Sequence, residues 1–236
     1  MKIIVGSSWA IGTFERGGKL SGPGIAQYLN LCGPVVNLSA GATDNNNHLR
    51  VLAKFLNNYH YRGTVSQPTE DTYYWIVHSP MYNKETEESR VLICTKDTIN
   101  LHDAVLSRLQ SILARANDIA KRNNIIINLI GGLCDLDNVD TTPYTSLNPI
   151  VPSWGKLCDN SYASSIFSIR GIDDFEKQVL ENKPELITQL HEIQAISFKK
   201  RRSMIILKEW FDANHPTQAA HIKLRDFLYP DQSHLL

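Results

Sequence analysis

Short apolar runs that alternate with segments of helical periodicity are the feature that most constrains the fold of this 236-residue chain. The runs are rich in β-branched and aromatic residues, as buried strands are, and each soon gives way to glycine, serine or proline. They lie at residues 2–5, 35–38, 73–77 and 125–130. Residues 47–59 and 97–122 carry apolar side chains at the spacing of an amphipathic helix, and a last helix is expected at about residues 217–228.

This alternation predicts parallel strands joined by right-handed helical crossovers. We expect an α/β fold, a three-layer α/β/α sandwich around a mostly parallel, flavodoxin-like sheet of about five strands. A chain of this length forms one domain by default, here residues 1–236. Residues 133–170 are dense in Asp, Asn, Pro, Ser and Thr, so we interpret them as an irregular excursion, with a role as a lid left open.

Charge and cysteine content narrow the range of partners. Lys plus Arg and Asp plus Glu both number 24, so no global field attracts nucleic acid or an anionic membrane. The N-terminus lacks the apolar core of a signal peptide, and no run approaches the length of a membrane span. The four cysteines form no Cys-x-x-Cys pair. We therefore expect a cytoplasmic protein with reduced thiols and no metal, nucleic-acid or membrane partner; its oligomeric state is left open.

A serine and an acid–histidine pair stand at opposite ends of the chain. Ser8 follows the first predicted strand, at the point where a parallel strand hands over to a loop. Asp212 and His215 are three positions apart, a spacing that lets a loop or a single turn aim both into one site. A serine hydroxyl needs a histidine to take its proton, and a carboxylate orients that histidine. These residue types therefore indicate a nucleophilic triad.

Three short blocks, in this order, are similar to those of the SGNH (GDSL) hydrolases. They are Val5-Gly6-Ser7-Ser8, Ser39-Ala40-Gly41 and Asp212-x-x-His215-Pro216-Thr217. The resemblance extends from residue 2 to about residue 228 and implies an esterase or acyl hydrolase that needs no cofactor. It implies Ser8 as nucleophile, His215 as general base and Asp212 as its orienting partner, with the backbone amides of Ser8 and Gly41 holding the oxyanion.

The sequence departs from this family in two places. Ser7 stands where the family usually has an aspartate before the nucleophile. The family's Gly-x-Asn-Asp block, whose asparagine donates to the oxyanion, does not occur. Spacing puts its equivalent at the end of the third predicted strand, residues 77–83, where Ser79 or Asn83 would donate instead.

Other polar residues are candidates for the same site. Residues 131–135 keep two glycines and an aspartate but have Cys134 in the asparagine position, and a thiol is a weak donor. We expect His78 to line the site at a strand end rather than to act as a second base. Asp44 and Asn45 would either contact a polar substrate or cap the following helix.

The leading functional hypothesis is hydrolysis of an ester, such as an acyl group on a carbohydrate or another small polar molecule, through an acyl-Ser8 intermediate. Because the Gly-x-Asn-Asp block is missing, a catalytically weak SGNH-like binding or structural protein is the alternative. A third hypothesis is a flavin or phosphate binder with its phosphate cradled by residues 6–12. The His-Ser-Pro end of the third strand is also similar to bacteriophage SGNH-like proteins, which would imply a phage enzyme or a virion-associated protein.

Overall fold

The computed structural model of the chain describes residues 1–14, 20–41, 43–61, 70–78, 98–132, 136, 139–158, 211–212, 215–232 and 234. Its centre is a five-stranded sheet in the order β4-β1-β5-β6-β7, in which every neighbouring pair is parallel. The strands are β1 (Lys2–Val5), β4 (Val35–Asn37), β5 (Thr72–Val77), β6 (Ile127–Gly131) and β7 (Leu147–Val151). The predicted parallel sheet of about five strands is confirmed.

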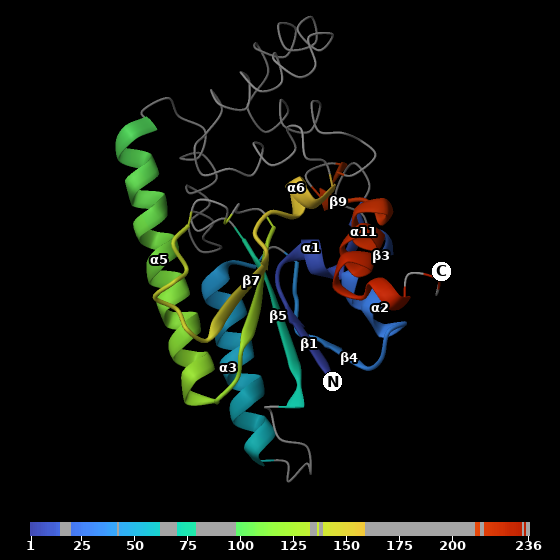
Figure 1. The fold of residues 1–236 in the computed structure, drawn as a ribbon, viewed down its shortest axis with the longest axis horizontal. Coiled ribbons are helices and arrows are strands. Elements are labelled where there is room, and N and C mark those ends of the chain that lie inside the picture. Colours follow the sequence, from blue (N-terminus) through green and yellow to red (C-terminus); the bar gives the residue numbers. More distant parts are fainter. Residues whose placement is uncertain are drawn as a thin grey trace, which may run out of the picture.

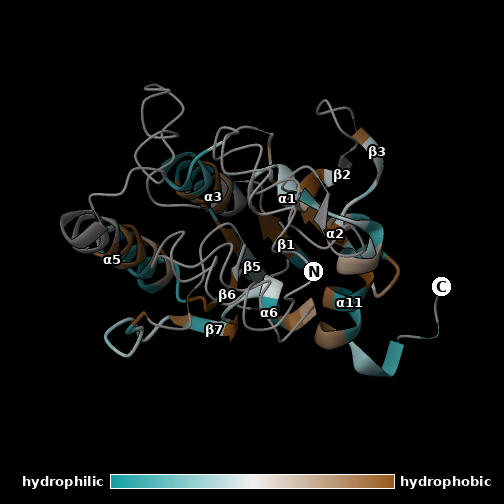
Figure 2. Ribbon diagram, turned by 90° about the horizontal axis from the view of Figure 1, so that it is seen from above, coloured by the Kyte–Doolittle hydropathy of each residue, from teal (hydrophilic) through white to brown (hydrophobic). Residues whose placement is uncertain are grey.

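Helices cover both faces of the sheet (Figures 1 and 2). One face packs against α3 (Asn45–Tyr61) and α5 (Thr98–Arg122). The other packs against α1 (Ser8–Ile11), α2 (Ile25–Asn30), α6 (Trp154–Cys158) and α11 (Gln218–Leu228). This arrangement is the three-layer α/β/α sandwich that the sequence predicted.

The strands bury both of their faces because their side chains alternate between the two helical layers. In β5, Tyr73 and Trp75 join the core against α3 and α5, whereas Tyr74 and Ile76 join the core against α2 and α11. All four are buried. An uninterrupted apolar run therefore suits a central strand, which explains why β5 was visible in the sequence.

Two small antiparallel ladders and a terminal turn complete the described elements. The ladders are β2 (Gly12–Phe14) with β3 (Leu20–Pro23) and β8 (Phe211–Asp212) with β9 (His215–Pro216), and η3 (Pro230–Gln232) follows α11. Strand β9 packs against α1, β2 and α11. The C-terminal part of the chain is thus brought beside the end of β1, where α1 begins (Figure 1).

The excursion expected at residues 133–170 is more regular than predicted where the structure describes it. It supplies β7, the fifth strand of the sheet, and helix α6. Strand β7 contains Asn148 and Pro149, and its pairing with β6 shifts register between Leu129 and Ile130. Proline in a short segment usually indicates a loop, and the sequence was interpreted in that way. Here the proline is tolerated because β7 is an edge strand with an irregular register.

Every helix in the described ranges is too short or too polar to cross a membrane.

Candidate functional site

A tight turn after β1 places Ser8 at the carboxyl edge of the sheet. Ser8 is the first residue of α1, and Ser7 before it has extended backbone dihedral angles. A Cβ atom at Gly6 would lie 3.1 Å from Ile76 Cβ and 3.3 Å from Ala10 Cβ, so a glycine lets this turn pack closely on β5. The remainder of α1 is anchored by buried apolar side chains, whereas Ser8 stays half-exposed.

The structure brings Ser8 and His215 together. The Oγ atom of Ser8 lies 2.8 Å from Nε2 of His215, within hydrogen-bonding distance. Strand β9, which carries His215, packs against α1, which begins with Ser8. The two residues that the sequence singled out as nucleophile and base therefore meet, and their catalytic roles remain to be tested.

Asp212 lies opposite His215 in the two-residue ladder of β8 and β9. Directly opposed residues of an antiparallel pair have Cα atoms about 4.5–5.5 Å apart. The two residues therefore face each other across a short antiparallel pair, whatever connects the two strands. The carboxylate of Asp212 lies outside the described part of the structure, so its contact with His215 stays a prediction.

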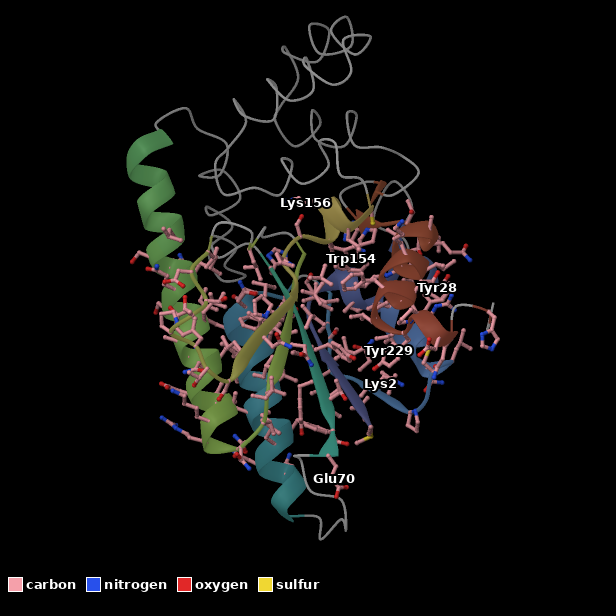
Figure 3. All side chains as sticks on the ribbon, viewed as in Figure 1. Lys2, Tyr28, Glu70, Trp154, Lys156 and Tyr229 are labelled. Atoms are coloured by element: carbon pink, nitrogen blue, oxygen red, sulfur yellow. The ribbon has the colours of Figure 1, made fainter. Side chains whose placement is uncertain are left out.

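A buried aromatic group lies behind this pair. The Nε1 atom of Trp154 donates to the Ala220 carbonyl at 3.1 Å and ties α6 to the start of α11 (Figure 3). The Trp154 ring makes edge contacts with Trp9, at 5.5 Å between ring centroids, and with His221, at 5.2 Å. The helical turn that carries the nucleophile candidate is thus anchored through Trp9, whose ring packs against Trp154. Sequence reasoning missed Trp154 because its segment reads as a loop.

His221 is fully buried in this aromatic group. Burial lowers the pKa of His221 to about 3, and nearby His215 acts in the same direction. His221 is therefore expected to be neutral at neutral pH, so its ring adds no positive charge beside His215.

The loop after β4 brings Gly41 close to the same turn. The Ala40 N–H donates to the Gly6 carbonyl at 3.2 Å, which joins this loop to the segment that precedes Ser8. Gly41 is exposed, and among the described residues a Cβ atom there would meet Ile11 Cδ1 alone, at an ordinary 3.9 Å. Packing against these residues therefore does not require glycine at position 41. Close approach of a substrate would require it.

The end of β5 is held by the first turn of α3. The Nδ2 atom of Asn45 donates to the His78 carbonyl at 2.6 Å, and its Oδ1 accepts from the His78 N–H at 2.8 Å. Asp44 Oδ1 accepts from the Asn47 N–H at 2.8 Å and caps α3. Asn45 and Asp44 thus have structural contacts of their own, and contact of either with a substrate stays a prediction.

The sheet order reverses between β1 and β5, and ligands of such sheets bind at the carboxyl ends of the strands beside that reversal. Ser8 follows one of these strands, and the half-buried His78 follows the other. The predicted donors Ser79 and Asn83, which come directly after, lie outside the described residues.

The rival segment for the missing block, residues 131–135, begins at the end of the neighbouring strand β6. The Gly132 N–H donates to the Val77 carbonyl at 3.2 Å, so the ends of β5 and β6 lie side by side. A Cβ atom at Gly132 would come within 2.8 Å of Ile76 Cγ2, which explains the glycine by packing alone. Cys134 lies outside the described residues, and the choice between the two segments stays open.

Comparisons with known proteins leave the family of this chain unassigned. Neither a protein-family model nor a curated protein sequence matches it. Protein YXIM of Bacillus subtilis is similar in structure over 98% of this chain, with a TM-score of 0.41 and 11% identity, but the match spans only 55% of that protein. A lipase/acylhydrolase from Enterococcus faecalis is similar over 98% of this chain and 95% of its own, with a TM-score of 0.38 and 13% identity. Likenesses this weak do not bear on function.

Proposed function

We propose that this protein is a serine hydrolase of the SGNH type that cleaves an ester bond through an acyl-Ser8 intermediate. The observation that carries the proposal is the 2.8 Å separation of Ser8 Oγ and His215 Nε2 at the carboxyl edge of the sheet. A serine after the first strand and a histidine from the far end of the chain meet where ligands of such sheets bind.

The proposed reaction begins when the Ser8 Oγ attacks the ester carbonyl and His215 Nε2 accepts its proton. For Nε2 to accept, the proton of the neutral ring must sit on Nδ1, and the Asp212 carboxylate is the proposed acceptor for it. The protonated His215 then donates to the departing alcohol. In the second half of the reaction, water attacks the acyl-Ser8 ester with His215 again as base. The bond between the acyl group and Ser8 Oγ breaks, His215 returns the proton to Oγ, and the carboxylic acid is released.

Backbone amides are the proposed donors to the oxyanion. The Ser8 N–H belongs to the first turn of α1, where amides have no partner within the helix. The Gly41 N–H comes from the neighbouring loop. A third donor would come from Ser79 or Asn83, in preference to Cys134. Each such donor contributes about 10²–10³ in turnover. An enzyme with only the two amides would therefore turn over more slowly than one with three donors, but would still be catalytic.

The proposed substrate is a small polar ester or an acylated carbohydrate. Support comes from the polar character of the edge around Ser8, where the half-buried Asp44 and His78 follow β4 and β5. Among the described residues, these polar side chains favour a small polar ester over a long acyl chain, which would need a continuous apolar lining.

Turnover of p-nitrophenyl acetate by three proteins tests this proposal. We expect the wild type to hydrolyse the ester and Ser8→Ala to fall to the background rate. Ser7→Ala is the matched control, because Ser7 lies in the same turn and its side chain makes no capping hydrogen bond. A folded wild type no faster than buffer would reject the proposal and favour a binding protein that lacks catalysis.

A further inference from the structure

We infer that Thr43 and His48 position the Gly41 amide as an oxyanion donor. The inference rests on the proposed function, and it identifies the side chains that orient one half of the oxyanion site. Thr43, His48 and Trp75 form a chain of hydrogen bonds, called here the Thr43 relay, that ends at the Ala40 carbonyl.

Only one assignment of protons satisfies the Thr43 relay. Trp75 Nε1 can only donate, so His48 Nδ1, 3.3 Å away, is the acceptor. The proton of the neutral His48 ring therefore sits on Nε2, which donates to Thr43 Oγ1 at 3.0 Å. The Thr43 hydroxyl is then left to donate its own proton to the Ala40 carbonyl at 2.6 Å.

The relay is enclosed in the core, which makes it strong and insensitive to pH. Thr43 is 5% exposed, His48 is 2% exposed and Trp75 is fully buried. Burial lowers the pKa of His48 to about 3, with His78 acting in the same direction and Asp44 opposing it. His48 therefore keeps its single proton on Nε2 throughout the range in which a histidine base would work.

The carbonyl that ends the relay belongs to the same peptide unit as the Gly41 N–H. In a trans peptide the C=O and N–H groups point in opposite directions. Because Thr43 holds the Ala40 carbonyl from the buried side, the Gly41 N–H is directed away from the core. The Ala40 N–H is also bonded, to the Gly6 carbonyl beside the Ser8 turn, so both sides of residue 40 are fixed.

His48 is needed because a lone threonine hydroxyl can rotate between donor and acceptor arrangements. With one lone pair of Oγ1 occupied by His48 Nε2–H, the hydroxyl proton points to Ala40. Hydrogen bonds in such a chain also polarise one another, which makes the Gly41 N–H a better donor. The device therefore orients and strengthens an amide that stabilises charge only in the transition state.

The test is Thr43→Val, which keeps the side-chain shape and removes the hydroxyl. We expect kcat for p-nitrophenyl acetate to fall by about 10²-fold, as for the loss or misplacement of an oxyanion donor. KM should change little, because the amide acts on the transition state. Thr43→Ser keeps the hydroxyl and should restore kcat to near the wild-type value.

Asn117→Ala is the matched control. Asn117 is a buried polar residue whose Oδ1 accepts from the Ser146 N–H at 3.0 Å, just before β7 and therefore at the opposite end of the sheet. It should lose stability as Thr43→Val does, yet keep kcat per folded molecule. If Thr43→Val retains as much kcat as this control while the wild type is active, the positioning role is wrong and the proposed function stands.

Two further outcomes complete the test. An inactive wild type would overturn the proposed function and this inference together. If Thr43→Val does not fold, ¹⁵N NMR of His48 in the wild type decides: a neutral ring protonated on Nε2 between pH 5 and pH 8 supports the relay. A ring protonated on Nδ1 would overturn it.

Discussion

The Ser8 hydroxyl oxygen lies 2.8 Å from Nε2 of His215, although 207 positions separate the two residues along the chain. The contact exists because β9 packs against α1, which follows β1, and because α1 and α11 pack on the same face of the sheet. A pair assembled from residues so far apart in the sequence forms only in the folded chain, so any reaction that uses it depends on the fold.

Replacing His215 with glutamine should lower kcat for ester hydrolysis by about 10⁴-fold, because Ser8 loses its proton acceptor. The double variant with Ser8→Ala should be no slower than either single variant, since the two residues act as a unit. Steady-state kinetics on p-nitrophenyl acetate measures both effects. His234→Gln, at an exposed histidine, serves as the control, and an equal loss in that variant would argue against a specific role for His215.

Asn45→Asp should destabilise the fold by about 1–3 kcal/mol, because Asn45 is buried and a carboxylate cannot donate to the His78 carbonyl. Urea denaturation measures the loss. Asn46→Asp is the matched control: Asn46 is exposed and its Oδ1 accepts from Arg115, a contact that a carboxylate keeps. Equal stability of the two variants would show that Asn45 does not hold the end of β5 in solution.

Gly24→Ala should destabilise the protein by about 1–3 kcal/mol through overpacking. A Cβ atom there would lie 2.4 Å from the Ile11 carbonyl carbon and 2.5 Å from the Gly12 nitrogen, which are backbone atoms that cannot rotate away. Since α1 ends at Ile11, ester turnover should fall as well. Gly22→Ala, whose Cβ would meet Thr13 at an ordinary 3.5 Å, should be near neutral in the same thermal and kinetic assays.

Acidification should destabilise the fold through the buried histidines. The pKa values of His48 and His221 are both lowered to about 3, below the value near 6.5 of an unfolded chain. Their stabilising contribution is therefore complete above pH 6.5 and is lost as pH falls from 6.5 toward 3, at up to about 1.4 kcal/mol per pH unit for each histidine. Urea denaturation at pH 7 and pH 5 measures this loss.

His221→Phe isolates one of these contributions, because other groups also titrate in this range. Its stability should fall by about 2 kcal/mol less than that of the wild type between pH 7 and pH 5. If the variant and the wild type lose the same unfolding free energy between pH 7 and pH 5, His221 is not held neutral by the fold.

The sheet was largely predictable because most of its strands are continuous apolar runs. β7 was not, since Asn148 and Pro149 interrupt its pattern and only its place beside β6 makes it a strand. The short helix α2 and the ladder of β2 and β3 were missed because elements this short show no clear hydrophobic periodicity. Tertiary packing, which local sequence does not encode, defines these elements.

The proposed reacting residues of the candidate site were predictable from the sequence, but the residues that hold the surrounding backbone were not. Ser8 and His215 stand in recognisable blocks, whereas Thr43 and His48 look like ordinary residues at a helix start until Trp75 is placed beside them. The last helix, expected from about residue 217, begins at Gln218 after Pro216 in β9, and Thr217 caps it by accepting from the Ala220 N–H.

The most direct test of the central claim, that Ser8 is an activated nucleophile, is mass spectrometry of the protein after treatment with a fluorophosphonate. The account predicts one adduct per molecule, located on Ser8, absent from Ser8→Ala and strongly slowed in His215→Gln. A folded wild type that forms no adduct, or forms it on another residue, would contradict the claim.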